Sequence, residues 1–564
     1  MHPSRRLLPL AAAVAVALAP PAARACGGLF CDLVNNQPVP VDQTGENILF
    51  VVDDVAGTVE AHIQIQYTGE PQKFAWIIPV TAIPEFSIGS EALFTNLLAA
   101  TVPTYSFTAA SDCADTSRGI DLCCACGDDG ANLQDSAGWS GEEPTTTGGP
   151  EVVKREVVGA FELVVLSGGT AQELWDWLNT HGYYQDGDAA PIVEQYLAEK
   201  HYFVAAKLRH GAGVDEIQPL VLTYAGNTPC VPLRLTAIAA APDMPIRVFA
   251  LGDGRTVPSN FRHVEPNDAR LDWQNGADNY FEVVGAALDE AGGRGFVTEY
   301  AGSSGNVAYA GIREPTWSAT PFFGVGPILP DNTTVIDMLI GQGLMQCDYI
   351  ADECVYNHPQ LLPLLRTYLP APPLVDEDVF YECLLCYAAE IDMAAWDADA
   401  FATGISERII LPANHALTLL ERWPYLTRML TILSPHEMTV DPEFTINHEL
   451  LGVDNARTAV LNFPCAGSNA MDLPTRRRVV LDKAGAWPEF DASMPWAARV
   501  EQMAPSGAPQ VLEDNADRID AALRASNARF DYDDGTRVRC SAGRGGPAGA
   551  LTLAVIFGLA WRGR

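Results

Sequence analysis

Residues 48–67, ILFVVDDVAGTVEAHIQIQY, carry the strongest secondary-structure signal that we use to predict the fold. Over 59–67 every second residue is apolar and the residues between them are polar, which is typical of a half-buried β-strand. Residues 48–53 form an apolar run that ends at an aspartate, and residues 54–57 have the composition of a turn. The stretch therefore predicts two strands joined by a turn, and with them a sheet.

Other segments extend this sheet and add helices to it. A helix is expected from Thr170, because Glu173 lies at the spacing of a capping box, and Gly182 would end it. The predicted fold class is α+β, with a mixed or antiparallel sheet domain and packed helices, followed by a mainly helical region that contains disulfides. The further predicted elements are strands over 74–80, 219–224, 233–240 and 246–251, a helix from Pro191, and helices over about 320–435 with a break at 370–373.

The chain divides into five parts by composition and pattern. A stretch rich in acidic residues, threonine and glycine, 127–150, is expected to be a mobile loop, and no repeat is visible. The expected parts are a signal peptide (1–25), an α+β domain (26–315), a mainly helical region (316–465), a polar acidic stalk (466–539) and a C-terminal sorting or transmembrane tail (540–564).

Composition excludes several classes of protein. The chain has 564 residues, of which 48% are hydrophobic, so it can bury large cores and is neither wholly disordered nor fibrous. It has 35 basic and 71 acidic residues, a net charge of −36. So acidic a surface repels phosphate backbones, and we expect no nucleic-acid partner.

The N-terminus predicts export. Two arginines at 5–6 precede an apolar run over 7–19 and the sequence A-R-A at 23–25, which is the order of a secretory signal peptide. Cleavage is expected after Ala25, before Cys26. A buried N-terminal helix is the alternative, but the prolines in this segment disfavour it. A lipoprotein signal is a further alternative, but Ala23 and Arg24 fit poorly where such a signal has a larger aliphatic residue and a small residue before the cysteine.

The C-terminus predicts an anchor. Cys540 is followed by small residues, an apolar run over 545–561 and two terminal arginines, so we expect a membrane helix with the bulk of the protein outside. A C-terminal core helix is the alternative. The tail resembles myxobacterial C-terminal sorting signals, which implies that Cys540 marks a processing site for a membrane protease. Gly563 interrupts its arginines, which departs from that pattern. The expected location is the cell surface or outer envelope, and the expected partners are the envelope membrane and the export and sorting machinery.

Thirteen cysteines are consistent with an exported, disulfide-stabilised chain. Setting Cys540 aside leaves twelve, enough for six disulfides, and short spacing predicts the pairs 26–31, 347–354 and 383–386. A redox role for the C-x-x-C at 383–386 and a metal knot among the cysteines at 113–126 are the alternatives, which the helical context and the tight spacing disfavour. The disulfide candidates are Cys26, Cys31, Cys113, Cys123, Cys124, Cys126, Cys230, Cys347, Cys354, Cys383, Cys386 and Cys465.

Motifs for catalysis are missing from the sequence. The ten histidines contain no H-x-x-x-H, and neither a nucleophile elbow nor a phosphate-binding loop is found. The acidic run at 531–535 lacks the glutamate of a calcium loop. The best polar cluster holds His263 and Glu265, which would share a face of a strand as a base and its orienting partner. A structural loop is the favoured interpretation, so we assign no catalytic residue, cofactor or metal site, and the ligand stays unknown.

Several stretches carry a family resemblance: ACGGLFC (25–31), AHIQIQYTGEPQKFAWIIPV (61–80), PLRLTAIAAAPDMPIRVFALG (232–252) and RGFVTEYAG (294–302). They resemble bacterial secreted proteins of the domain-of-unknown-function family 2330. The resemblance covers 25–310, and 320–465 more loosely. It implies export and an α+β body, and it supplies no activity.

We therefore expect a non-catalytic protein of the cell envelope that acts in binding or in surface structure. The alternative is an extracellular hydrolase whose site is scattered along the sequence. A redox protein working through Cys383 and Cys386 is a third hypothesis.

Overall fold

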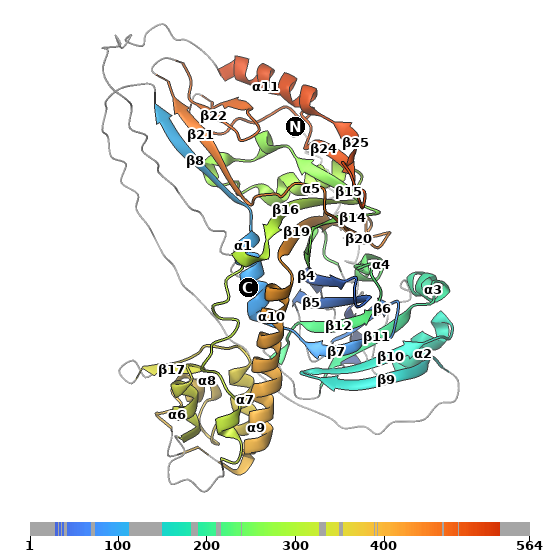
Figure 1. Ribbon diagram of the computed structural model, residues 1–564, viewed down its shortest axis with the longest axis vertical. Helices are drawn as coiled ribbons and strands as arrows, with labels where there is room; N and C mark the ends of the chain where they lie inside the picture. Colours follow the sequence, from blue (N-terminus) through green and yellow to red (C-terminus); the bar gives the residue numbers. More distant parts are fainter. Residues whose placement is uncertain are drawn as a thin grey trace, which may run out of the picture.

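The fold is described from a computed structural model (Figure 1). The predicted signal peptide, most of the predicted loop over 127–150 and the predicted tail from Cys540 lie outside the described residues. The described residues are 29–31, 33–34, 37–38, 42–68, 74–111, 149–181, 190–209, 216–238, 240–325, 334–348, 353–387, 390–391, 393–464, 467–482 and 484–530.

A mixed ten-stranded sheet is the backbone of the molecule. Its β4 and β5 pair antiparallel from Asp42–Thr68 to Asp53–Thr58, so the two strands and the turn predicted from residues 48–67 are confirmed. The pairs β13–β4 and β15–β16 are parallel. In order, the strands are β25 (Gln510–Asp514), β24 (Ala497–Gln502), β15 (Arg262–Pro266), β16 (Gly295–Ser303), β19 (Tyr425–Leu433), β13 (Met244–Gly252), β4 (Asp42–Asp53), β5 (Thr58–Thr68), β12 (Leu220–Ala225) and β7 (Glu85–Ile88).

A second, antiparallel sheet of five strands packs face to face on one end of the first. Phe50 and Val59 of the large sheet and Leu163 and Val204 of the small sheet belong to the core between them. Burial of alternate side chains on these facing surfaces holds the two sheets together. In order, the strands are β1 (Leu29–Cys31), β6 (Phe74–Val80), β11 (Tyr202–Leu208), β10 (Phe161–Ser167) and β9 (Glu151–Val158).

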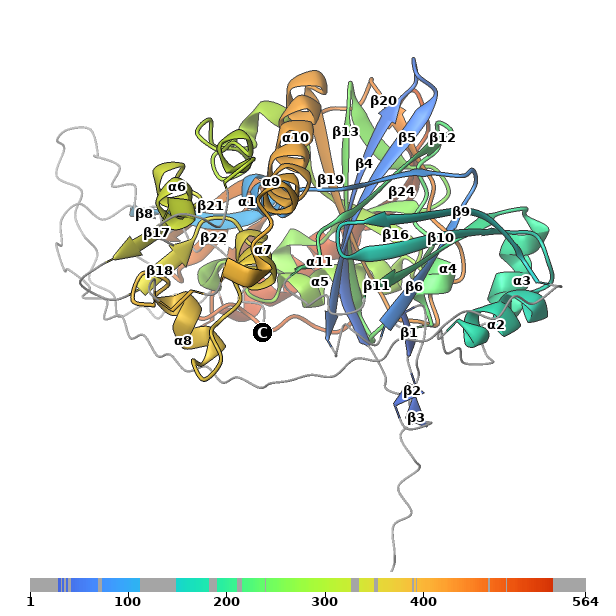
Figure 2. The ribbon, with the colours of Figure 1, turned by 90° about the horizontal axis from the view of Figure 1, so that it is seen from below.

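Helices cover the outer face of each sheet, which gives this end of the molecule four layers (Figure 2). Helices α2 (Ala171–Thr180) and α3 (Ala190–Ala198) cover the small sheet. Helices α1 (Glu91–Thr101) and α10 (Leu411–Arg422) cover the large one. Strand β4 is therefore buried on both faces, which explains its continuous apolar run. The capping box predicted at Thr170 is also confirmed.

The other end of the large sheet carries a separate core (Figure 1). Helix α5 (Tyr280–Glu290) packs there beside helix α11 (Ala516–Phe530) and a four-stranded sheet. The strands of this sheet are β23 (Arg478–Val480), β22 (Ala470–Asp472), β21 (Ala456–Phe463) and β8 (Thr104–Ser111).

A helical module with its own core fills residues 317–410. Trp317, Phe322 and Phe401 are among its buried side chains. Its elements are α6 (Thr334–Gly341), β17 (Met345–Asp348), β18 (Glu353–Tyr356), α7 (Leu361–Tyr368), α8 (Glu377–Glu382) and α9 (Ala398–Ile405).

Two expected boundaries require correction. Strand β19 lies between β16 and β13 in the large sheet, so the region 316–465 is not separate from the α+β domain. The stretch 466–539 is not a stalk over its described part, because β24, β25 and α11 belong to the folded body. Charged residues of α11 such as Asp517 and Arg518 are exposed, whereas Ile519 and Leu523, one helical turn apart, are buried in the core.

The strand expected over 233–240 is also wrong. Residues Leu233–Thr236 form the short helix α4 instead. The alternation of Leu233, Arg234 and Leu235 resembles a strand, but Arg234 pairs with Asp441 and both leucines are buried beside it. The partner of Arg234 comes from a distant part of the chain, so local periodicity did not indicate it.

The described cysteines agree in part with the predicted pairing. Disulfides join Cys347 to Cys354 and Cys383 to Cys386, as predicted. Cys230 is a free thiol, so the expectation that twelve cysteines close six disulfides is wrong for this residue. The side chain of Cys31 and the residues Cys26, Cys113, Cys123, Cys124, Cys126, Cys465 and Cys540, together with Ala25, lie outside the described residues.

Among the described residues, no helix combines the length and the apolar character that a membrane crossing needs.

Candidate metal centre

A cavity of about 910 Å³ lies where the helical module meets the sheets. One wall comes from β7, β9 and β12 at the edges of the two sheets. The other comes from α7, α9 and the start of α10. Glu60 and His415 reach this cavity from the sheet side and the helix side respectively. Elements that are far apart in the sequence therefore meet around one space.

Glu60 and His62 share the polar face of strand β5. Val59, Ala61 and Ile63 point into the core between the two sheets, so alternation directs Glu60 and His62 to the opposite face. The sequence pattern predicted a half-buried strand here. His62 is nevertheless only 1% exposed, and Glu60 is 16% exposed. The polar face of β5 is therefore largely shielded from solvent at these two residues.

His415 comes from α10, on the outer layer. Residues Ser406–Ile410 form the π-helical turn η9, which joins α9 to α10, and Pro412 stands in the first turn of α10. Such π-turns recur at functional sites, where they redirect the side chains that follow. Ala416 and Leu419 pack α10 on the large sheet, while His415, 40% exposed, points toward β5.

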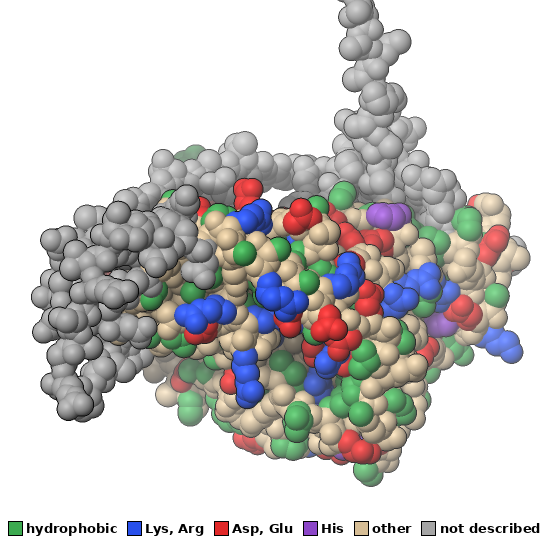
Figure 3. Space-filling view, turned by 90° about the horizontal axis from the view of Figure 1, so that it is seen from above, with side chains coloured by type: hydrophobic (Ala, Val, Ile, Leu, Met, Phe, Trp, Pro, Cys, Tyr) green, Lys and Arg blue, Asp and Glu red, His purple; other side chains and the backbone are tan. Residues whose placement is uncertain are grey.

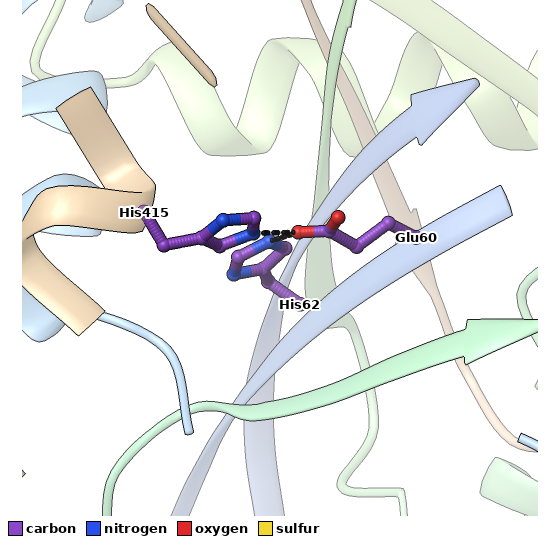
Figure 4. A group of neighbouring side chains, drawn as sticks. All are labelled: Glu60, His62 and His415. Atoms are coloured by element: carbon purple, nitrogen blue, oxygen red, sulfur yellow. Dashed lines mark hydrogen bonds and ion pairs between the residues drawn. The ribbon is translucent and has the colours of Figure 1, made fainter. Parts of the chain in front are cut away.

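The three side chains converge on one point (Figure 4). Nε2 of His62 and Nε2 of His415 each lie 2.5 Å from the same oxygen, Oε1 of Glu60. The two imidazole rings are stacked, with centroids 5.8 Å apart and planes 9° apart. Among the described residues this is a group of three possible metal ligands whose ligand atoms all lie within 4.8 Å of one another.

The electrostatics of the group favour an ionised carboxylate. Burial, the strongest influence on Glu60, raises its pKa, but hydrogen bonds and charge from His415 and His62 outweigh it and lower the pKa to about 2. The hydrogen bond to Glu60 raises the pKa of His415, against the effect of burial. The Glu60 carboxylate is therefore ionised at neutral pH, and a metal ion that binds His415 must displace the proton that Glu60 favours there.

These groups form a donor set that suits a divalent transition metal. Zinc accepts imidazole nitrogen and carboxylate oxygen at bond lengths of about 2.0–2.2 Å, and its catalytic sites use three protein ligands with one position left open. Tetrahedral ligand atoms then stand roughly 3.4 Å apart. The oxygen of Glu60 needs to withdraw by only about 1 Å from the two nitrogens to admit the ion.

The orientation of the His62 ring is set by packing. Its Nδ1 is buried and has no hydrogen-bond partner among the described residues. A Cβ atom on Gly89 would lie 3.1 Å from this nitrogen and 3.0 Å from Cβ of Pro219. The absence of a side chain at position 89 therefore leaves the ring just enough room to face Glu60.

His263 and Glu265 do not form the pair that the sequence analysis considered. His263 is buried, and its Nδ1 lies 3.2 Å from Oε2 of Glu501 while its Nε2 lies 3.1 Å from Oγ1 of Thr298. Glu501 stands opposite His263 because β24 pairs with β15. Glu265 is exposed and lines a different cavity. His263 is thus part of a buried polar network, and it lines none of the cavities described for this molecule.

Sequence reasoning missed the Glu60–His62–His415 group, for which it expected no metal site. The spacing E-x-H on a strand was a weak signal, because polar residues alternate along every half-buried strand. His415 lies 355 positions from Glu60, and nothing in its neighbourhood resembles a metal motif.

Comparison with known proteins identifies a family for this chain but indicates no activity. Residues 20–323 match the family model described as an uncharacterized protein conserved in bacteria (DUF2330). No curated protein and no solved structure matches the chain.

Proposed function

The chain belongs to the DUF2330 family of bacterial proteins, and we propose that it is an exported protein of the cell envelope that binds a divalent transition-metal ion, zinc first, through Glu60, His62 and His415. The observation that carries the proposal is the approach of two imidazole nitrogens to one carboxylate oxygen, at 2.5 Å each. Three ligands of this chemistry at the rim of a cavity suit a site that exchanges its metal or presents it to a ligand.

The location rests on the two ends of the chain. The order of charges, apolar residues and A-R-A at the N-terminus supports export, and disulfides at 347–354 and 383–386 suit an oxidising compartment. The cysteine, small-residue spacer, apolar run and arginines at the C-terminus support a sorting tail that holds the protein at the envelope. In this proposal Cys540 is the processing site.

The test is metal binding by the purified protein, produced in an oxidising compartment and stripped with a chelator. Calorimetry with zinc chloride and metal analysis after desalting should give one ion per chain. Mutating residues that only orient metal ligands typically lowers metal affinity by about 10–100-fold. Because His415→Ala and Glu60→Ala each remove a ligand itself, each should weaken zinc binding by more than about 100-fold. His436→Ala, which removes an exposed imidazole elsewhere, should leave it unchanged. Equal zinc binding by all variants would overturn the proposal.

A hydrolytic role is the second candidate, because two of the three ligand residues line the large cavity. Glu60 and His415 line this cavity, whereas His62 is buried behind them. Three protein ligands and a position for water or substrate are typical of zinc hydrolases, in which the metal lowers the pKa of the bound water. The zinc-loaded protein should then cleave an activated ester or phosphate ester. Zinc binding without turnover would contradict the hydrolytic role and would support metal binding as the only role of the site.

A further inference from the structure

A second cavity, about 510 Å³ in volume, opens at the α11 end of the molecule, away from the candidate metal centre. Figure 3 views this end and shows basic side chains gathered across its middle, interleaved with acidic ones. The gathering is unusual for a chain with twice as many acidic as basic residues. Five arginines line the cavity: Arg476, Arg477, Arg478, Arg499 and Arg524.

Three of these arginines have carboxylate partners. Nε of Arg477 lies 2.9 Å from Asp520, Nε of Arg478 lies 3.5 Å from Asp472, and Nη2 of Arg499 lies 3.5 Å from Asp514. These ion pairs hold the guanidinium groups against the wall. The carboxyl groups on the wall itself are Glu265, Asp268, Asp514 and Asp520.

The other two arginines are unpaired. The guanidinium groups of Arg476 and Arg524 form neither an ion pair nor a hydrogen bond with any residue in the described part of the chain. Both residues are exposed, and both line the cavity. They bring positive charge to a space whose remaining arginines already have partners.

The backbone of Arg476 adopts a conformation that favours glycine. It stands in the turn between β22 and β23 with φ +68°, in the left-handed region where glycine is usual. Hydrogen bonds from the amide of Arg476 to Leu473 and from the amide of Leu473 to Arg477 close this turn. A residue other than glycine has a strained backbone in this conformation, and such residues are often found at functional sites. Glycine would relieve the strain but would leave the cavity without this charge.

We propose that this cavity binds a phosphate-like oxyanion, with Arg476 and Arg524 as the groups that contact it. The planar fork of a guanidinium group matches the paired oxygens of a phosphate or sulfate. The volume admits a small molecule that carries one such group. Carboxylates pair with three of the five arginines that line the cavity, so within the described part of the chain the guanidinium groups of Arg476 and Arg524 are the two left to attract the anion. This site is independent of the metal centre.

Calorimetric titration with inorganic phosphate, at constant ionic strength, tests the proposal. One phosphate should bind per chain, and Arg524→Ala should weaken binding at least tenfold. Arg518→Ala is the matched control, because Arg518 stands on the same helix, pairs with Glu513 and lies outside the cavity. No saturable phosphate binding, or equal weakening by Arg518→Ala and Arg524→Ala, would overturn the proposal.

Arg476→Gly separates binding from folding. It removes the strain of the left-handed conformation, so the melting temperature should stay the same or rise while phosphate binding falls at least tenfold. A variant that binds phosphate like the unaltered protein would contradict the role of Arg476.

The source of the oxyanion is distinguished by sedimentation with vesicles of phosphatidylglycerol and phosphatidylcholine. Vesicle binding that Arg524→Ala and free phosphate both abolish would support the site and assign it to a lipid headgroup. Phosphate binding with no vesicle binding would support the site and assign it to a soluble ligand. The proposal is overturned if phosphate does not bind and if the protein binds vesicles to the same extent with Arg524→Ala and with free phosphate present.

Discussion

The role that a histidine can play in this protein depends on the residues that the fold places beside its ring. His62 faces Glu60 and His415 and is closed off from solvent. His263 is buried with a glutamate and a threonine beside it and lines none of the cavities described for this molecule, so its neighbours hold it as part of the core. His358 is buried beside Trp317, with its Nδ1 accepting a hydrogen bond from the amide of Gln360 at 3.2 Å. The same residue type thus has three different environments.

The pH dependence of stability should report His358. Burial lowers its pKa to about 4 from an ordinary 6.5, so the unfolded chain binds the proton first as the pH falls. The stability that the neutral ring contributes is present above pH 6.5 and is lost toward pH 4, to the extent of roughly 2–3 kcal/mol. His358→Asn keeps an acceptor for Gln360 and does not titrate. Urea unfolding at pH 7, 5.5 and 4.5 should show a smaller acid-side loss in this variant.

His436→Asn serves as the control for this series, because His436 is exposed. Its unfolding free energy should follow that of the unaltered protein at every pH. Parallel pH profiles for His358→Asn and the unaltered protein would contradict the prediction.

At the scale of elements, net charge was a poor guide to helix α11. Its surface is charged, and this polar, acidic composition predicted a stalk. Ile519 and Leu523 nevertheless stand on one side of the helix and are buried against the core that α5 and the four-stranded sheet share. A helix needs only one apolar stripe to pack, so a polar average does not exclude a folded segment.

Leu523→Ala should therefore destabilise the whole fold by about 2–4 kcal/mol, because it leaves a cavity under α11. Ala525→Ser, at an exposed position of the same helix, should change the free energy of unfolding by less than about 0.5 kcal/mol. Chemical denaturation of the two variants measures the difference. If Leu523→Ala unfolds at the same denaturant concentration as the unaltered protein, α11 is not part of the cooperative fold.

At the scale of the whole molecule, the large sheet is assembled from distant segments. Strand β19 stands between β16 and β13, and β24 extends the sheet beyond β15. The helical module is inserted before α10 and β19, and it supplies one wall of the cavity at the metal centre. Neither the family-matched part of the chain nor the helical module therefore contains the complete site.

A chain that ends at residue 323, where the family match ends, should not fold. Without β19 the apolar strands β13 and β16 lose their shared neighbour, and their exposed edges favour aggregation. A chain that ends after Phe530 keeps every described element and should give a monomer with a cooperative melt. Size-exclusion chromatography and thermal unfolding compare the two. A monomeric, cooperatively melting short chain would show that β19 is dispensable.

Local elements and the family could be predicted from the sequence. Alternation over 59–67, the capping box at Thr170 and the short cysteine spacings at 347–354 and 383–386 each depend on residues a few positions apart, so their patterns were readable. Which polar residues meet depends on the packing of segments that are far apart in the sequence. Strand pairing placed Glu501 beside His263, and the layer formed by α10 placed His415 over Glu60 and His62. Those contacts depend on how distant strands and helices pack, which local periodicity does not record.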